Sequence, residues 1–237
     1  SIFIHVGEEK TSKQSLVLGN ELALLINQNL KADLSERYQI ESELEIEFET
    51  YFSQFFMPTI RGLDIGSKKR YAGLIEKLGE QQLIFKGLES VRTDWTELAK
   101  EFQRTLYLQV FNQDSVVSYV KGIVSNTYAG EYDDKLLYRK RIRRKLDHYV
   151  KNVPPHIKAA RLADKINTEN NQPLKFQNKG WVEYYLTTSG PQAKGYVNAP
   201  LDYQLYVERQ LASVADAILP FIGTSFNEIT DSKSFFS

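Results

Sequence analysis

The pattern of hydrophobic and polar residues divides the chain into a strand-rich first part and a mostly helical second part. Hydrophobic and polar residues alternate over residues 2–6 and again over 44–49, which predicts two short strands. Helical spacing over 13–31 predicts an amphipathic helix between them. Residues 70–75 and 82–86 read as two strands around a turn at Gly79, which predicts a hairpin.

Helical spacing dominates the second part. Hydrophobic residues at four-residue steps predict a helix over 98–110, and a second helix carries the valines and isoleucine of 116–124 and ends near Gly130. A third helix is expected to begin near Asp133 and to continue into the basic residues that follow residue 138. The first of these helices has a capping signature, in which Asp94 accepts hydrogen bonds from the helix start.

The remaining elements complete an α+β fold. Pro155 suits the first position of a fourth helix, residues 181–187 predict a short strand, and residues 201–221 are helical again. We therefore expect a domain of antiparallel strands with one helix over residues 1–95, followed by a mostly helical domain over 96–237.

Composition limits the class of protein without identifying it. Hydrophobic residues make up 42% of the chain and charged residues 25%, as in soluble globular proteins. The absence of cysteine excludes disulfides and thiolate metal sites and fits a reducing cytosol. No apolar run approaches the length of a membrane span, and the start lacks the features of a signal peptide. The first residues read as a strand cut at its beginning.

The net charge of zero hides a strong asymmetry. Residues 1–60 hold ten acidic and four basic residues, whereas 139–161 hold nine basic residues and one acidic residue. In a helix, most of these cations would form one face, and that face would either be solvated or bind a polyanion. The nine cations, which we call the basic block, are Arg139, Lys140, Arg141, Arg143, Arg144, Lys145, Lys151, Lys158 and Arg161.

Two shorter motifs precede the basic block. Lys68, Lys69, Arg70 and Tyr71 stand at the entry to a strand, where they form either a solvated basic turn or a contact to phosphates or to acceptors in the minor groove. The run 89–95 contains Arg92, which could support a DNA backbone, together with Asp94 and Trp95, for which structural roles are favoured.

These motifs, with the Pro-His run at 155–161, resemble the end of the palm and the thumb of family B DNA polymerases in order and approximate spacing. The surrounding sequence is most similar to the bacterial DNA polymerase II branch. The likeness extends from Ser1 to about Phe226, and Thr93 stands where the family often has a second arginine. The resemblance implies the following DNA-contacting residues: Lys68, Lys69, Arg70, Tyr71, Arg92, Arg139, Lys140, Arg141, Arg143, Arg144, His156, Lys158 and Arg161. For His156, donation to a phosphate and a helix-capping role are equally compatible with the sequence.

The resemblance also implies what this chain lacks. Family B polymerases hold divalent metals with aspartates, and the last of these belong to a strand turn expected just before Ser1. Alternation places Glu43, Glu45, Glu47 and Glu49 on one strand face, but a solvated face is favoured over a metal site. We therefore expect no cofactor in this chain, Mg²⁺ in the parent enzyme, and no polymerase activity in the chain alone.

Partners follow from the same resemblance, with two alternatives. Primer–template duplex DNA, the rest of the polymerase and a sliding clamp are implied, without a membrane, in the bacterial cytoplasm near the nucleoid. The clamp would contact Phe235 and Phe236, although a frayed tail is favoured there. The alternatives are a stand-alone nucleic-acid-binding protein and a scaffold whose basic block binds an acidic protein.

Overall fold

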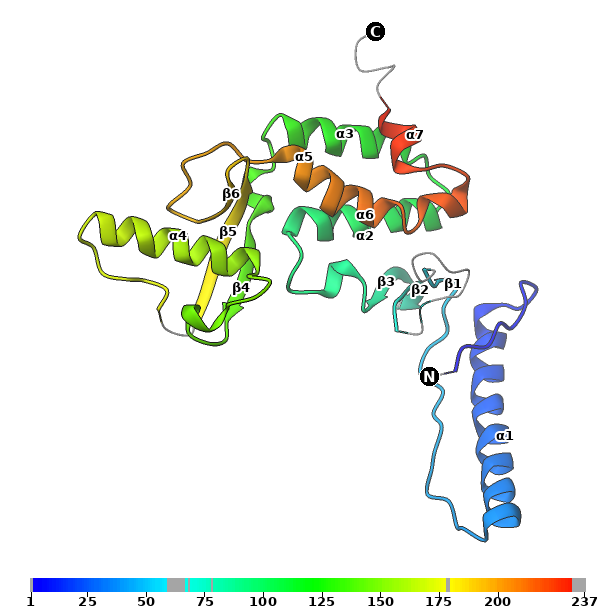
Figure 1. The fold of residues 1–237 in the computed structure, drawn as a ribbon. Coiled ribbons are helices and arrows are strands. Elements are labelled where there is room, and N and C mark those ends of the chain that lie inside the picture. Colours follow the sequence, from blue (N-terminus) through cyan, green and yellow to red (C-terminus); the bar gives the residue numbers. More distant parts are fainter. Residues whose placement is uncertain (1, 59–66, 68, 78, 178–179, 232–237) are drawn as a thin grey trace. The chain divides into compact units, whose positions relative to one another are not determined.

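The computed structural model describes residues 2–58, 67, 69–77, 79–177 and 180–231 (Figure 1). The chain forms two compact units, the first comprising Ser1–Phe56 and Ala72–Ile84, and the second comprising Met57–Tyr71 and Phe85–Ser237. Mixed helices and small antiparallel sheets confirm the α+β class. The domain boundary near residue 95 stays a prediction.

The first unit contains one long helix, as expected. Helix α1 (Ser12–Tyr38) begins with a capping box, in which Thr11 accepts a hydrogen bond from the Gln14 N–H and the Gln14 side chain accepts one from the Thr11 N–H. It ends at Gln39, which has the left-handed conformation common after a last helical turn. The predicted helix over 13–31 is confirmed and extends further.

The strands predicted at 2–6 and 44–49 are wrong. The alternating segment lies beside α1 instead, where the Asn27 side chain accepts from the Ile46 N–H and donates to the Ile46 carbonyl, both at 2.8 Å. One amide side chain thus supplies the two backbone hydrogen bonds that a neighbouring strand would supply. Residues 2–6 belong to no strand and are mostly exposed, and Phe3 contacts the Phe55 ring at 4.8 Å between centroids.

The predicted hairpin is confirmed. Strands β2 (Tyr71–Lys77) and β3 (Glu80–Lys86) are neighbours in a three-stranded sheet whose order is β1-β2-β3. Gly79 has a φ of +80° in the turn, a conformation that glycine adopts without strain. Strand β1 (Gln54–Phe56) pairs antiparallel with β2, and Phe55 lies opposite Gly73.

The second unit has a helical part that buries the predicted hydrophobic positions. Helices α2 (Glu97–Phe111) and α3 (Val117–Tyr128) confirm the first two predicted helices of this region, and Leu98, Phe102 and Leu106 are buried. The helical stretch near the C-terminus is broken into short pieces. They are α5 (Tyr203–Tyr206), the π-helical segment Val207–Ala212, α6 (Ser213–Ala215), a 3₁₀ turn at Leu219–Ile222 and α7 (Phe226–Thr230).

The helix predicted to run into the basic block is wrong. The chain instead forms a 3₁₀ turn at Asp133–Leu136, strand β4 (Tyr138–Ile142) and a second 3₁₀ turn at Leu146–His148. Buried residues four apart, such as Tyr138 and Ile142, satisfy both helical and strand periodicity, so the local pattern does not separate the two. Pairing with a distant strand decides in favour of β4.

That partner is β5 (Gly180–Thr187), which confirms the strand predicted at 181–187. Strands β4, β5 and β6 (Gly190–Ala193) form an antiparallel sheet in that order. Figure 1 shows α4 (Pro155–Glu169) alongside this sheet, and α4 begins with Pro155 at its first position, as expected.

The two faces of the β4–β5–β6 sheet differ. The inner face buries Ile142 and Val182, and Tyr138 stacks on Tyr184 with ring centroids 5.2 Å apart. Tyr206 of α5 stacks on Tyr138 at 5.8 Å, and its hydroxyl accepts a hydrogen bond from the Leu186 N–H. The opposite face carries alternate residues of the same strands, and its β4 positions are exposed.

Candidate nucleic-acid interface

The basic turn before β2 is held by a buried carboxylate. Arg70 forms an ion pair with Glu89, whose side chain is only 8% exposed. The other Glu89 oxygen accepts from the Gln103 amide at 2.8 Å, and the Gln103 carbonyl oxygen accepts from the Ser90 N–H at 2.7 Å. The turn preceding β2, the 3₁₀ turn at Glu89–Val91 and α2 are therefore joined by one hydrogen-bond network.

This network fixes one part of the predicted Lys-Lys-Arg-Tyr site. Lys69 is exposed at the turn, whereas Arg70 is partly buried by its pairing with Glu89. Gly87 packs so closely against the Lys69 carbonyl that a Cβ would overlap it, and Gly87 has a φ of +64°. Tyr71 is half-buried at the start of β2, and Lys68 lies outside the described residues.

Sequence reasoning missed Glu89 and Gln103 as supporting residues. Gln103 is fully buried between hydrophobic positions of α2, and Glu89 follows the buried Leu88. A polar residue inside the hydrophobic stripe of a helix is the available signal, because a buried amide needs hydrogen-bond partners. Burial, followed by the charge of Glu89, raises the pKa of the neighbouring Tyr107 well above its ordinary value.

Arg92, Asp94 and Lys140 come together in a second cluster. Arg92 Nε and Nη2 donate to the two Asp94 oxygens at 3.0 and 2.8 Å, and Lys140 Nζ lies 3.5 Å from Asp94 Oδ2. The Arg92 hydrogen bonds, aided by the positive charge of Lys140, lower the pKa of Asp94. Asp94 therefore links the run that precedes α2 to strand β4.

The predicted capping role of Asp94 is wrong. Helix α2 begins at Glu97, and its cap is Thr96, whose hydroxyl accepts from the Ala99 N–H at 3.3 Å. Asp94 lies too far upstream to reach the free N–H groups of the first turn. Trp95, expected to act as a core anchor, is only partly buried.

The basic block is spread over β4, the loop that follows it and helix α4. Arg139 and Arg141 point away from the inner face of β4, whereas Lys140 lies on the inner side and is partly buried. Arg144 lies over the Tyr149 ring, with its guanidinium carbon 4.3 Å from the ring centroid. On β4 and the loop that follows it, five exposed cations have no ion-pair partner among the described residues: Arg139, Arg141, Arg143, Arg144 and Lys145.

The three predicted site residues on helix α4 differ in exposure and in their contacts. Lys158 is exposed. Arg161 donates from one nitrogen to the carbonyls of Leu146 and Tyr149, at 2.6 and 2.9 Å, so its guanidinium supports the backbone around the 3₁₀ turn at Leu146–His148. His156 packs edge-on against Tyr149 at 6.5 Å between ring centroids. Burial and then the charge of Lys140 lower the pKa of His156.

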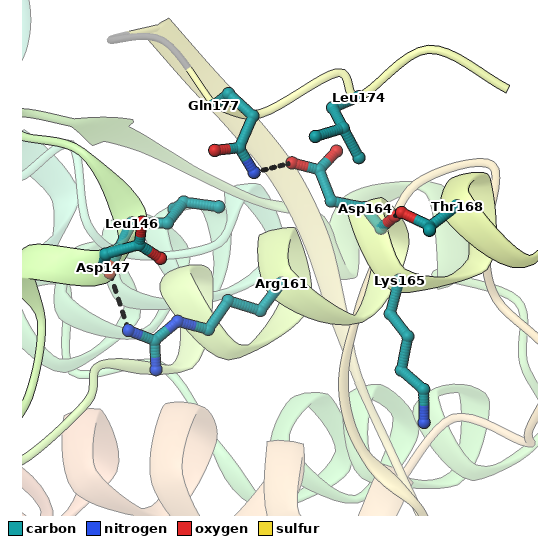
Figure 2. A pocket seen from close by; sticks show the side chains of 8 residues that line it. All are labelled: Leu146, Asp147, Arg161, Asp164, Lys165, Thr168, Leu174 and Gln177. Atoms are coloured by element: carbon teal, nitrogen blue, oxygen red, sulfur yellow. Dashed lines mark hydrogen bonds between the residues drawn. The ribbon is translucent and has the colours of Figure 1, made fainter.

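A small pocket lies beside Arg161. Figure 2 shows Arg161 reaching toward the turn at Leu146, while the Gln177 amide points toward Asp164 and donates a hydrogen bond to it. Asp164 is buried and accepts from the Lys175 and Phe176 N–H groups and from the Gln177 amide at 2.7–3.0 Å. These contacts satisfy the Asp164 carboxylate and anchor the segment after α4.

The described part of the chain holds no metal-binding cluster. Among its residues, no three histidine or acidic side chains lie close enough together to hold a metal ion. Glu43, Glu45, Glu47 and Glu49 are exposed along an irregular segment. No helix within the described ranges has the length and hydrophobicity needed to cross a membrane. Phe235 and Phe236, predicted to contact a clamp, lie outside the described residues.

Known proteins are similar in sequence to this chain over most of its length. The family described as DNA polymerase family B matches residues 1–222. DNA polymerase II of Escherichia coli K12 is 46% identical over 95% of this chain, which corresponds to 29% of that protein. DNA polymerase 2 of Aeropyrum pernix is 32% identical over 67% of this chain and 20% of its own length. The chain therefore spans less than a third of these relatives.

The network around Glu89 gives a stability prediction. Glu89→Gln keeps the size of the side chain but removes the charge that pairs with Arg70. We expect the free energy of unfolding to fall by about 1–3 kcal/mol, because a partly buried guanidinium loses a charge-assisted hydrogen bond. Urea unfolding followed by circular dichroism measures the change. Glu131→Gln, at an exposed position, is the matched control and should change stability by less than about 0.5 kcal/mol. Equal losses in the two variants would contradict the assigned role of Glu89.

His156 gives a pH prediction. Its pKa is lowered in the folded chain, whereas the unfolded chain keeps a value of about 6.5. As the pH falls below about 6.5, the unfolded state binds a proton first, so the free energy of unfolding falls. We expect His156→Gln to flatten this decline in urea unfolding measured from about pH 7.5 to pH 5. His148→Gln, at an exposed position, should keep the slope. An unchanged slope in His156→Gln would refute the linkage.

Proposed function

Because the chain belongs to DNA polymerase family B, we propose that it forms part of the surface with which a DNA-directed DNA polymerase holds primer–template duplex DNA. In this proposal residues 1–95 are the C-terminal segment of the palm and residues 96–237 are the thumb. The parent enzyme would extend a primer on a DNA template in the bacterial cytoplasm, as the name of its E. coli relative suggests. The rest of that polymerase is the implied protein partner.

One observation carries the proposal. Arg139, Arg141, Arg143, Arg144 and Lys145 form a row of exposed cations on β4 and the loop after it, and none of them has an acidic partner within the described ranges. Like charges that are close together repel, so a row of this kind is stabilised by an anionic ligand. A DNA backbone presents regularly spaced phosphates and requires no base-specific donors.

The basic row would bind the duplex without reading its sequence. Arginine and lysine that neutralise phosphates release condensed counterions, and this release makes the affinity strongly dependent on salt. Contacts of this class fix position and register, whereas specificity comes from contacts to base edges. Lys69 and Arg92 extend the proposed surface. Lys69 precedes the Arg70–Glu89 pair in the chain, and Arg92 is itself held by its pairing with Asp94.

In this proposal, another segment of the polymerase binds the catalytic metal ions. Family B polymerases use divalent metals for nucleotidyl transfer, and Mg²⁺ is the metal implied for the parent enzyme. The described residues do not fit such a pair, since no cluster of carboxylates is present among them. We therefore assign DNA holding to this chain and bond formation to another segment of the polymerase. Clamp docking through Phe235 and Phe236 stays a hypothesis.

A salt titration tests the DNA-holding function. We expect Arg141→Ala/Arg143→Ala/Arg144→Ala to weaken binding to fluorescent primer–template DNA. The slope of log affinity against log salt should become shallower by about 0.9 for each phosphate that the variant no longer neutralises. Fluorescence anisotropy across a salt series gives both quantities.

The control is a variant with the same loss of charge in the first unit. Lys10→Ala/Lys13→Ala/Lys31→Ala removes three exposed cations and should leave the slope unchanged. Equal effects of the two triple variants would show that only net charge matters, which contradicts a defined site. Binding to an acidic polypeptide that persists when duplex DNA competes would instead support the scaffold alternative.

Catalytic inactivity is tested separately. We expect the purified chain to incorporate no nucleotides into a primer–template in the presence of Mg²⁺ and all four deoxynucleoside triphosphates, because it lacks a carboxylate set for metals among its described residues. Denaturing gel electrophoresis of a labelled primer detects extension by a single nucleotide. Extension that co-purifies with the chain and changes with substitutions in it would contradict the assignment.

A further inference from the structure

The outer face of the β4–β5–β6 sheet carries an exposed aromatic side chain among cations. In the register of β4 and β5, Arg141 lies opposite Trp181 and Arg139 lies opposite Glu183. All four residues alternate with the buried inner-face positions, so they share the outer face. We propose that Trp181, supported by Arg139, is a stacking site for an unpaired base of a DNA strand.

The indole is available and already oriented. Trp181 is 52% exposed, although tryptophan is highly buried on average in folded proteins. The guanidinium carbon of Arg139 lies 4.5 Å from the centre of the indole ring, within the range of a cation–π contact. One ring face is therefore covered by a cation that restrains the side chain, while about half of the residue's surface remains exposed to solvent.

The charge on this face selects an anionic occupant. Arg139 and Arg141 are exposed and have no acidic partner among the described residues, whereas Glu183 is paired with Lys194 at 3.7 Å. The loop after β4 adds Arg143 and Arg144 nearby in sequence. A nucleotide matches both features, because its base presents a flat π-face to the indole and its phosphate presents an anion to Arg141.

The required nucleotide is an unpaired one. In a duplex, the faces of the bases are already stacked on one another, and the exterior presents groove edges, sugars and phosphates. An indole on the surface of a sheet can stack only on a base that has left the helical stack. Stacking of this kind tolerates any sequence, because every base has a π-face.

This inference deepens the proposed function and rests on it, because it assumes that the basic surface faces DNA. The two sites have different ligands, however. Duplex holding depends on phosphates along the row from Arg139 to Lys145, whereas the Trp181 site requires a free base. The ligands can therefore be supplied separately.

Tryptophan fluorescence tests the site directly, since the chain has only two tryptophans. Trp95→Phe leaves Trp181 as the sole reporter. We expect an oligothymidylate of about 12 nucleotides to quench this emission and an abasic oligonucleotide of the same length to leave it nearly unchanged. Equal quenching by both, or quenching by neither, would overturn the proposal.

Anisotropy with labelled DNA provides a second measurement that does not depend on the Trp95→Phe variant folding. We expect Trp181→Ala to weaken oligothymidylate binding about tenfold, as the loss of one stacked base implies, and to change binding of a blunt duplex by less than about twofold. Tyr128→Ala is the matched control, because Tyr128 is 50% exposed and has acidic neighbours, Glu208 and Asp202. It should alter neither affinity.

The outcomes separate the two proposals. An equal loss of duplex and single-strand affinity in Trp181→Ala, or no loss of either, would refute the stacking site. If the unmodified chain fails to bind duplex DNA while oligothymidylate still quenches Trp181, the proposed duplex-holding function fails and the stacking site stands. If the chain binds duplex DNA but quenching of Trp181 does not depend on the base, the stacking site fails and the duplex-holding function stands.

Discussion

The buried carboxylate of Glu89 is the constraint around which the basic turn is organised. A charge removed from water is costly unless it is paired and hydrogen-bonded, and Glu89 meets both requirements through Arg70 and Gln103. The three segments that supply these groups must therefore come together in one arrangement. Lys69 is exposed beside this network. The network therefore fixes the position of the Lys69 backbone, while its long side chain lies in solvent.

Elements whose signals are local were predictable from the sequence. The hairpin has a glycine at its turn, α4 has Pro155 at its first position, and α2 repeats hydrophobic residues every four positions. Strand β4 was not predictable in this way, because its identity depends on hydrogen bonds to β5, about forty residues further along the chain. The strand predicted at 44–49 does not form, because the side chain of Asn27 supplies the hydrogen bonds that a partner strand would supply.

For the candidate site, too, the sequence shows which residues are present but not which residues they contact. A concentration of cations is visible in the sequence, and their exposure around Arg143 follows from their charge. Their individual roles depend on neighbours that are distant in sequence. Lys140 pairs with Asp94, and Arg161 is used to support backbone carbonyls, so neither is an unpaired surface cation. The pairing of Arg139 with Trp181 arises only from the register of two strands.

The start of α2 depends on a residue near the other end of the chain. The Gln210 side chain, in the π-helical segment, accepts hydrogen bonds from both the N–H and the hydroxyl of the capping residue Thr96, at 3.3 and 2.9 Å. These residues are 114 positions apart. Closing so long a loop costs chain entropy before the contact repays it, and contacts of this kind slow folding. During synthesis on the ribosome, the cap of α2 stays incomplete until Gln210 has emerged and docked.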